Sequence, residues 1–383
     1  MKIRIIVSAI ILVVLLSGIT LSAAPMINNN TARKVEKAFS KIIDSDDMSG
    51  AIYAVCDGEV VYDKGKGEAV KGIANSPDVV YAVASVTKQF TAAAIMMLYE
   101  QGKLDLDDKL DKYFPDYKYG KDITLRMLMY QRSGIPDYSV DIYDDKVLAT
   151  CYGDTDIKDA VEVRDDVGAK ENREEIRKMF LSRELLFEPD KYFDYSDSNY
   201  ALLAEVIPIV TGVGFHDFIR RNIFDPIGMT NSAFIDEHEF LGDVVIAEPD
   251  HEEFEYDYFE YYGAEYGCGD IMLTPKDLYK WYRALFSGRV VSKENLKLIT
   301  TNYSSKGELG YGFGLMISDE GDTKAVYHYG WIPSFYSSVF YVPEIDYFQT
   351  VLSNRSTGNP HKVSADLVKA FCEIKNVKLI NIE

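Results

Sequence analysis

The stretch YAVASVTKQFTAAAIMMLYEQGKLDLDDKL, residues 81–110, decides how the rest of the chain is interpreted. Phe90 to Gln101 is rich in Ala, Met and Leu, which predicts a buried helix. Gly102 is placed to end that helix. The tetrad Ser85-Val86-Thr87-Lys88 comes directly before it. Residues three apart lie on one face at the start of a helix, so we expect the Lys88 ammonium to reach the Ser85 hydroxyl.

This serine and lysine spacing indicates a nucleophile with its own proton-handling partner. A free serine hydroxyl is a weak nucleophile and needs a nearby base. A helix N-terminus favours negative charge, and the Ser85 N–H is a candidate donor to an oxyanion. Lys88 would have to be desolvated, or lie near other cations, to release its proton easily.

Two further short motifs carry candidate site residues. In Tyr195-Ser196-Asp197, a tyrosine close to a lysine ammonium would have a lowered pKa and could act as a general base. In His328-Tyr329-Gly330, the glycine would let a substrate backbone approach a strand closely, and the histidine offers a donor. Both motifs also have ordinary structural interpretations, since the chain contains 28 Tyr and a single histidine on a strand is usually structural.

The order of expected elements predicts the fold class. Asp57-Gly58 between the β-prone runs 51–56 and 60–62 is a strong hairpin signal. Further strands are expected at 312–317, 325–329, 335–342 and 348–352, and helices at 31–43, 125–130, 174–186, 199–211, 215–224, 278–286 and 364–372. We therefore expect an α/β (α+β) fold, in which an antiparallel sheet is flanked by helices and joined to a mostly helical subdomain over about residues 104–280.

Two segments between these elements leave their interpretation open. Residues 138–170 are acidic and weakly patterned, as in an insertion or a lid. Residues 236–266 interleave acids with aromatic residues. They form either a solvated loop with partly buried rings or a substrate rim that favours cations or aromatic groups.

The charge and the scarce metal-binding residues exclude several function classes. A net charge of -20 argues against nucleic acid as a partner, because phosphate binding needs a basic patch. The five His show no metal-ligand spacing, and neither a G-x-S-x-G elbow nor a phosphate-binding glycine loop occurs. The four Cys are widely spaced, which favours isolated buried thiols. No cofactor is implied.

The N-terminus is typical of a secretory signal. Lys2 and Arg4 precede an apolar run over residues 5–16, and small residues follow up to Ala24. We expect residues 1–24 to direct export to the extracellular or periplasmic space, residues 25–30 to form a linker, and residues 31–383 to form the main domain. The alternative is an uncleaved anchor, since residues 5–24 are about long enough to cross a bilayer. Nothing later in the chain is long and apolar enough to do so.

Taken together and in this order, the motifs resemble those of the serine β-lactamase-related hydrolases. That family includes class C β-lactamases, penicillin-binding DD-peptidases, D-aminopeptidases and related esterases. The resemblance extends from about residue 33 to 372. The supporting stretches are 81–110, ITLRMLMYQRSGIPDY at 123–138, FDYSDSNYALLAEVI at 193–207, FDPIGM at 224–229, GCGDIMLTPKDLYKW at 267–281 and HYGWIPSF at 328–335.

The resemblance implies an acyl-enzyme mechanism. Ser85 would be acylated by the substrate carbonyl, and Lys88 and Tyr195 would move the protons. The oxyanion would sit between the Ser85 N–H and the Trp331 N–H, beside Gly330, and water would release the acyl group. The implied partner is a small molecule or peptide with a scissile amide or ester.

Three positions depart from the family pattern and leave the substrate open. Asp197 stands where the family usually has Asn; an ionised Asp cannot donate to a substrate carbonyl, and it could pair with Lys88 instead, which would shift the base role to Tyr195. Tyr329 replaces a Thr or Ser whose hydroxyl helps to hold a substrate carboxylate. Pro189-Asp190 replaces Pro-Gly, a change expected to affect only the turn.

The sequence therefore predicts a serine hydrolase that acts on an ester, an amide or a peptide with a D-residue, with Asp197, His328, Gly330 and Trp331 around the substrate. One alternative is a class C-like β-lactamase. Another is a binding or regulatory protein that has kept the fold and lost turnover.

Overall fold

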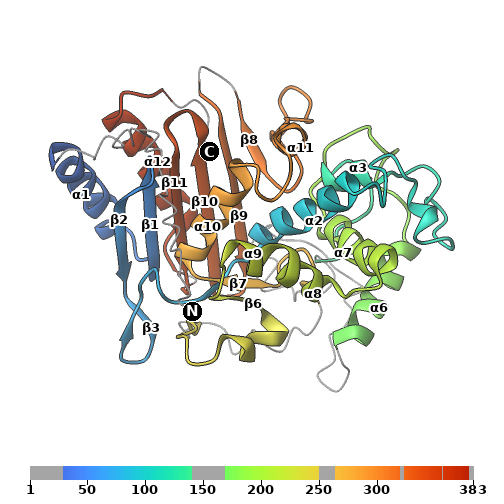
Figure 1. Ribbon diagram of the computed structural model, residues 1–383, viewed down its shortest axis with the longest axis horizontal. Helices are drawn as coiled ribbons and strands as arrows, with labels where there is room; N and C mark the ends of the chain where they lie inside the picture. Colours follow the sequence, from blue (N-terminus) through green and yellow to red (C-terminus); the bar gives the residue numbers. More distant parts are fainter. Residues whose placement is uncertain (1–28, 140–168, 250–263, 320–322, 356, 379–383) are drawn as a thin grey trace, which may run out of the picture.

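A six-stranded antiparallel sheet forms the centre of the computed structural model, which describes residues 29–139, 169–249, 264–319, 323–355 and 357–378 (Figure 1). The strands lie in the order β2 (Glu59–Lys66), β1 (Gly50–Cys56), β11 (Tyr347–Ser353), β10 (Phe335–Val342), β9 (Ala325–Ile332) and β8 (Met316–Ser318). The N-terminal hairpin thus pairs with C-terminal strands, which confirms the expected sheet. The expected signal segment lies outside the described residues, as do residues 140–168 of the first acidic segment and residues 250–263 of the second.

The register of the sheet follows from its turns. Asp57 and Gly58 adopt positive φ angles of 51° and 78°, as a tight two-residue hairpin turn requires. β1 then pairs with β11 from Gly50 opposite Ser353 to Cys56 opposite Tyr347. β8 is shorter than the strand expected over 312–317, because Gly314 has a φ of 70° and turns the chain just before it.

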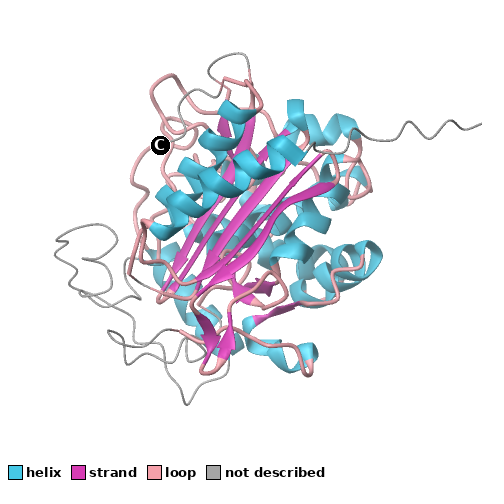
Figure 2. Cartoon of the chain, turned by 90° about the vertical axis from the view of Figure 1, so that its left-hand side faces the viewer, coloured by secondary structure: helices cyan, strands magenta, loops and turns pink. Residues whose placement is uncertain are grey.

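Helices cover both faces of the sheet (Figure 2). α1 (Asn29–Asp44) and α12 (Pro360–Ile374) pack on one face, where they meet Ile52 and Ala54 of β1. α10 (Pro275–Phe286) packs on the other face, which receives the alternate residues Ala51 and Tyr53. All residues of β1 are therefore buried, which explains its continuous apolar run.

The helical region lies beside the sheet, and α2 (Lys88–Glu100) leads into it (Figure 1). Almost all of α2 is buried, as its composition predicts. The other helices are α3 (Leu125–Met129), α6 (Ala169–Ser182), α7 (Asp197–Thr211), α8 (Phe215–Ile219), α9 (Asp225–Ile227) and α11 (Lys293–Ile299). Among the described residues, no single helix is long and apolar enough to span a membrane; Asp197–Thr211 with Phe215–Ile227 meets that test only as a pair bent by 78°.

Some boundaries differ from those expected for local reasons. α6 ends at Ser182 rather than 186, because the Leu186 N–H is drawn away to the carbonyl of Gly134 at 2.9 Å. α1 begins two residues before Thr31, at Asn29. A three-stranded sheet of β5 (Tyr81–Ala82), β7 (Ile271–Leu273) and β6 (Ser232–Phe234) was not expected, because strands of two or three residues leave no periodic signal.

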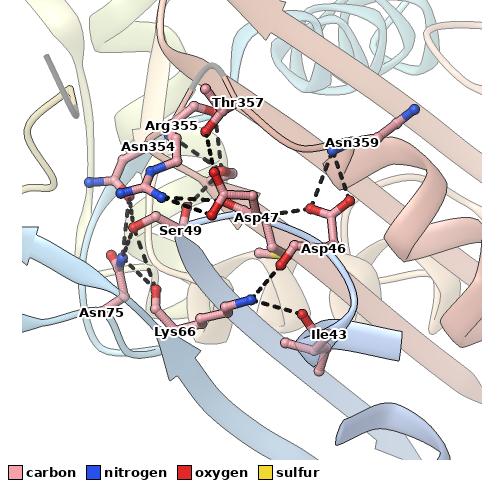
Figure 3. Close-up of polar contacts among 12 residues, drawn as sticks. Ile43, Asp46, Asp47, Ser49, Lys66, Asn75, Asn354, Arg355, Thr357 and Asn359 are labelled. Atoms are coloured by element: carbon pink, nitrogen blue, oxygen red, sulfur yellow. Dashed lines mark hydrogen bonds and ion pairs between the residues drawn. The ribbon is translucent and has the colours of Figure 1, made fainter. Parts of the chain in front are cut away.

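A buried polar network fastens one end of the large sheet (Figure 3). The Asn354 side-chain oxygen accepts hydrogen bonds from Ser49 Oγ at 3.0 Å and Asn75 Nδ2 at 3.2 Å, and Asn354 Nδ2 donates to the carbonyl of Glu248 at 2.7 Å. Asn75 Oδ1 in turn accepts from the hydroxyl of Tyr81 at 2.6 Å. The network therefore connects the end of the sheet to β5, the strand that leads into the candidate site.

Candidate active site

Ser85 lies in a short 3₁₀ turn, η1 (Ala84–Thr87), that precedes α2. Ala84 has a positive φ of 46°, a conformation that costs free energy for a residue with a Cβ. The turn is held from both sides at Val83, whose N–H donates to the Ile271 carbonyl at 3.0 Å and whose carbonyl accepts from Ser337 Oγ at 2.6 Å. Two separate strands, β7 and β10, thus fix Ser85 in a strained turn rather than in the regular helix.

The Lys88 ammonium lies at the centre of the candidate site. Its Nζ donates to Ser85 Oγ at 2.9 Å and to the Cys268 carbonyl at 2.9 Å, and it forms an ion pair with Asp197 Oδ1 at 2.6 Å. The side chain is completely buried. The structure therefore brings together the serine and the lysine of the tetrad. It also pairs Lys88 with Asp197, which was one of the alternatives that the sequence left open.

The charge of Asp197 determines the protonation of Lys88. Burial alone would lower the pKa of Lys88, but the adjacent carboxylate outweighs it and raises that pKa well above its ordinary value. Lys88 is thus an ammonium in the resting site, where it can hold Ser85 and Asp197 but cannot accept a proton.

Tyr195 places its ring beside this ammonium, with Lys88 Nζ 4.9 Å from the ring centroid. The sequence predicted a lowered pKa for Tyr195, and the structure does not support that prediction. Burial raises the pKa of Tyr195 well above its ordinary value, and the opposing effect of Lys88 is smaller. Tyr195 is therefore a neutral phenol in the resting site.

Gln131 positions the loop that carries Tyr195 and Asp197. Its side-chain oxygen accepts from the Ser196 N–H at 3.2 Å and from Asn199 Nδ2 at 2.5 Å. Its carbonyl accepts from the Asp194 N–H at 2.9 Å. Because these bonds fix both sides of the loop, α7 begins at Asp197 with its carboxylate facing Lys88.

The turn before this loop tolerates the replacement of glycine by Asp190. Asp190 has a φ of 67°, in the left-handed region that Asp adopts more readily than most residues. Its N–H donates to the Arg132 carbonyl at 2.8 Å, and its carboxylate accepts from Arg132 Nε at 3.3 Å. The local contacts of Asp190 are thus those of a turn residue.

Gly330 brings the edge of β9 against Ser85. A Cβ at this position would lie 2.5 Å from the Val83 carbonyl oxygen and 3.0 Å from the Ser85 nitrogen, so only glycine fits. β8 pairs with β9 only from Ala325 to Tyr327. The part of β9 that contains Gly330 and Trp331 therefore extends past β8 beside Ser85.

His328 is buried next to the site as a neutral group. Burial lowers its pKa to about 3, and Lys88 acts in the same direction. Its Nε2 lies 3.1 Å from the Tyr311 hydroxyl, and its Nδ1 lies 2.5 Å from the Tyr329 carbonyl. His328 therefore supplies no positive charge to a substrate.

Tyr329 points to the opposite face of the sheet, because side chains alternate along a strand. Its ring packs at 4.6 Å from the His361 ring and 5.7 Å from that of Phe340, in the layer formed with α12. The hydroxyl of Tyr329 is thus not presented next to Ser85.

Besides Gln131, four residues of the site were not singled out from the sequence. Asp137 accepts from the Asp197 N–H at 3.3 Å, and Tyr311 contacts both His328 and the Tyr195 ring. Glu265 and Cys268 bring their ligand atoms within 4.8 Å of an Asp197 oxygen, a spacing that could hold a metal ion. The Lys88 ammonium, which forms an ion pair with Asp197, already supplies the positive charge that a metal ion would bring to these three residues. The sequence signals were that Asp137 and Cys268 lie in stretches supporting the family resemblance, and that Glu265 lies in the segment 236–266, one interpretation of which was a substrate rim.

Comparisons with known proteins agree with this geometry. A family model described as Beta-lactamase matches residues 35–371. The chain is 28% identical over 274 residues to the putative penicillin-binding protein PbpX of Bacillus subtilis (strain 168). The matched region covers 71% of this chain and 62% of PbpX, so the chain spans less than two thirds of this relative. It is 27% identical over 349 residues to Penicillin-binding protein 4* of the same organism, with 85% of this chain and 72% of that protein covered.

Two solved structures have the same fold. The octameric penicillin-binding protein homologue from Pyrococcus abyssi superposes with a TM-score of 0.74 at 26% identity, covering 90% of this chain and 78% of that one. D-amino acid amidase from Ochrobactrum anthropi SV3, complexed with L-phenylalanine, superposes with a TM-score of 0.72 at 22% identity, covering 91% and 98%.

Proposed function

Because the chain belongs to the Beta-lactamase family, a family of serine hydrolases, we propose that it cleaves an amide or ester bond through an acyl-enzyme on Ser85. The observation that carries this proposal is the 2.9 Å hydrogen bond from Lys88 Nζ to Ser85 Oγ, inside a buried site. A positioned partner of this kind is what a serine hydroxyl needs to become a nucleophile.

The resting protonation states point to a relay for the first proton. Lys88 is charged and Tyr195 is neutral, so neither can accept the Ser85 proton directly. In the proposed step, Lys88 passes one proton to Asp197 along their 2.6 Å contact and accepts the Ser85 proton as the Oγ–carbonyl bond forms. The net change is that a proton moves from Ser85 to Asp197.

The remaining groups serve the later steps. The Ser85 and Trp331 N–H groups are proposed to hold the oxyanion where β9 approaches η1. The neutral phenol of Tyr195 is proposed to donate a proton to the leaving group. In the proposed last step, water attacks the acyl carbon and gives one proton to the Tyr195 phenolate. The proton held by Asp197 returns through Lys88 to Ser85 Oγ as the ester bond breaks, and the acid product leaves with the remaining OH of the water.

Hydrolysis of p-nitrophenyl acetate tests this proposal without knowledge of the natural substrate. The wild-type protein is expected to release nitrophenolate in an initial burst, because acylation of Ser85 precedes a slower deacylation. Ser85→Ala is expected to show neither the burst nor turnover above the buffer rate. Turnover retained in Ser85→Ala would show that this serine is not the nucleophile.

The ion pair between Lys88 and Asp197 favours one second candidate, a binding or regulatory protein. If Asp197 keeps Lys88 permanently charged, Ser85 would be acylated slowly or not at all. This candidate predicts ligand binding with no burst in the wild type. A class C-like β-lactamase is less well supported, because neither His328 nor Tyr329 offers a group for the substrate carboxylate.

A further inference from the structure

We propose that His361 positions the oxyanion donor at Trp331, because it holds the carbonyl at the other end of the same peptide unit. His361 is the second residue of α12, which packs on the face of the sheet opposite to η1. It would act through the backbone of β9 rather than by contact with the substrate. The inference rests on the proposed hydrolase function and names a positioning residue for the same site.

A hydrogen bond between His361 and β9 is the first observation. His361 Nε2 lies 3.2 Å from the carbonyl oxygen of Gly330. A carbonyl oxygen only accepts hydrogen bonds, so Nε2 carries the proton and donates it. The Gly330 carbonyl and the Trp331 N–H belong to one planar, trans peptide unit and point in opposite directions. A bond that fixes the direction of the carbonyl therefore also fixes the direction of the N–H.

The second observation is that this part of β9 is held from both faces of the sheet. Gly330 pairs with Ser337 of β10. On one face, Ser337 Oγ donates to the carbonyl of Val83 at 2.6 Å, two residues before Ser85. On the other face, His361 bonds to Gly330. The two contacts together fix β9 relative to η1, which is the approach on which the proposed oxyanion site depends.

The pairing of β9 explains why an additional contact matters at this point. β10 pairs with β9 from Val326 to Ile332, whereas β8 pairs with it only from Ala325 to Tyr327. Among the described strands, the end of β9 that contains Gly330 therefore pairs along one edge. A hydrogen bond from α12 restrains the peptide unit where the second strand no longer does.

The third observation is the group of aromatic rings around His361. Its ring lies 4.6 Å from the ring of Tyr329 and 5.5 Å from the ring of Tyr336. Tyr336 in turn lies 6.4 Å from the ring of Trp331. These contacts restrict the rotation of the imidazole and keep Nε2 directed at β9. Tyr329, which departs from the family pattern, thus supports His361 instead of facing the substrate.

The neutral state of His361 suits a group that orients a peptide. Burial lowers the pKa of His361, and hydrogen bonds to the backbone carbonyls of Gly330 and Ser337 offset this only in part. The first turn of α12 acts in the same direction as burial, since a helix N-terminus disfavours a cation. A neutral imidazole has a single N–H, and the bond to Gly330 places it on Nε2.

The preference for an ester over a thionoester tests this role. p-Nitrophenyl acetate is compared with its thionoester analogue, in which sulfur replaces the carbonyl oxygen. Sulfur accepts hydrogen bonds weakly, so the thionoester gains less from the oxyanion donors. Each kcat/KM is divided by the rate constant of the same compound with hydroxide. The corrected ratio of ester to thionoester then reports the oxyanion site, because the fraction of folded protein cancels.

Two amide variants separate the bond from the bulk of the side chain. His361→Gln keeps an N–H close to the position of Nε2 and should keep a ratio close to that of the wild type. His361→Asn carries the same amide on a shorter side chain that does not reach Gly330. It is expected to lower the corrected ratio about 10-fold, the effect of one hydrogen bond. The loss for the ester should fall in kcat, because the oxyanion forms only in the transition state.

Lys362→Gln is the matched control on α12. Lys362 is the next residue, its side chain is 67% exposed, and it pairs with Asp366 on the same helix. The control variant should keep the wild-type ratio, and thermal unfolding of all three variants shows whether each one folds.

The outcomes separate this inference from the proposed function. If ester hydrolysis depends on Ser85 but His361→Asn keeps the wild-type ratio, even at lower activity, the positioning role is wrong and the hydrolase proposal stands. An equal fall of the ratio in His361→Gln and His361→Asn also overturns the role, because the donor at Nε2 would then not matter. If the wild type shows no turnover that depends on Ser85, the hydrolase proposal fails, and this inference fails with it.

Discussion

At the scale of single residues, the substitution of aspartate for the usual asparagine changes the electrostatics around Ser85. An asparagine at position 197 would leave Lys88 buried without a counter-charge, and burial would then lower the pKa of Lys88. With Asp197 present, the pKa of Lys88 is instead raised. The proton acceptor for Ser85 is therefore expected to be the coupled pair of Lys88 and Asp197, rather than the lysine alone.

Removal of either proton-handling partner should slow acylation. Lys88→Ala and Tyr195→Phe are each expected to lower kcat/KM for a p-nitroanilide substrate, whose leaving group must be protonated, by at least about 100-fold, the usual scale for a positioned acid or base. Stopped-flow measurement of the nitroaniline burst separates acylation from deacylation. A Tyr195→Phe protein with normal turnover would remove Tyr195 from the mechanism.

Asp197→Asn should improve the reaction with β-lactams. The amide can donate to a substrate carbonyl, and it no longer repels the β-lactam carboxylate. Intact mass after exposure to benzylpenicillin should show faster acylation of Ser85 in the variant than in the wild type. An unchanged rate would mean that Asp197 is not what limits β-lactam recognition.

The contacts of Lys88 with Ser85 and Asp197 could be predicted from the sequence, whereas the degree of burial of the site residues could not. The reach of Lys88 to Ser85 follows from their spacing, and its pairing with Asp197 follows from opposite charges in one site. The raised pKa of Tyr195 and the neutral state of His328 could not be predicted, because both depend on how completely the fold removes water from those side chains.

At the scale of secondary-structure elements, the close approach of β9 to η1 positions the oxyanion donors proposed here. It depends on the missing side chain of Gly330, since a Cβ would also lie 2.3 Å from Ser337 Oγ. Ser337 is the residue that holds the Val83 carbonyl, so the crowding would reach the strained turn before Ser85.

Gly330→Ala is therefore expected to lower kcat/KM by at least about 100-fold, as loss of an oxyanion donor does. Gly214→Ala is the matched control, because a Cβ at Gly214 meets no atom within 4 Å and its φ is negative. The control should keep wild-type activity, and thermal unfolding of both variants shows whether they fold. Full activity in Gly330→Ala would contradict the proposed oxyanion geometry.

Long, regular elements could be predicted from the sequence, whereas short ones could not. β10 and α7 carry enough periodic residues to define their type, and the observed bounds agree closely with those expected. η1, β5 and β7 have two to four residues each and form only because the rest of the molecule holds them. Ser85 lies in one of these short elements, so its strained turn had no sequence signal.

At the scale of the whole molecule, a cluster of the buried His216 with the carboxylates around it lies next to the loop that contacts Lys88. His216 Nε2 bonds to Asp270 Oδ2 at 2.8 Å, and its ring stacks on Phe234 at 3.8 Å. Asp270 lies two residues after Cys268, the carbonyl of which accepts from Lys88. The cluster therefore links the helical region to the loop that holds the lysine.

This cluster should make stability depend on pH. Burial alone would lower the pKa of His216, but hydrogen bonds to Asp270 and Glu237 outweigh it and raise the pKa from 6.5 to about 9. A raised pKa means that the stabilisation is complete below pH 6.5 and is lost as the pH rises through 9. Urea unfolding should show a decrease of at most about 3 kcal/mol over this range. His216→Gln should lack this component, and an unchanged decrease in the variant would assign it to other groups.

The overall architecture could be predicted because the N-terminal hairpin and the C-terminal strands each carry apolar runs that need a partner. Their pairing into one sheet follows from that need. The path of the chain between them could not be predicted in the same way. The contact between Gln131 and the Tyr195 loop, for example, joins segments that share no sequence pattern.

The central claim is that Ser85 is an activated nucleophile, and intact mass spectrometry after exposure to an alkyl fluorophosphonate tests it most directly. The wild-type protein is expected to gain the mass of one phosphonyl group, and Ser85→Ala is expected to gain none. Absence of the adduct from the wild type, or an equal adduct on Ser85→Ala, would contradict the claim.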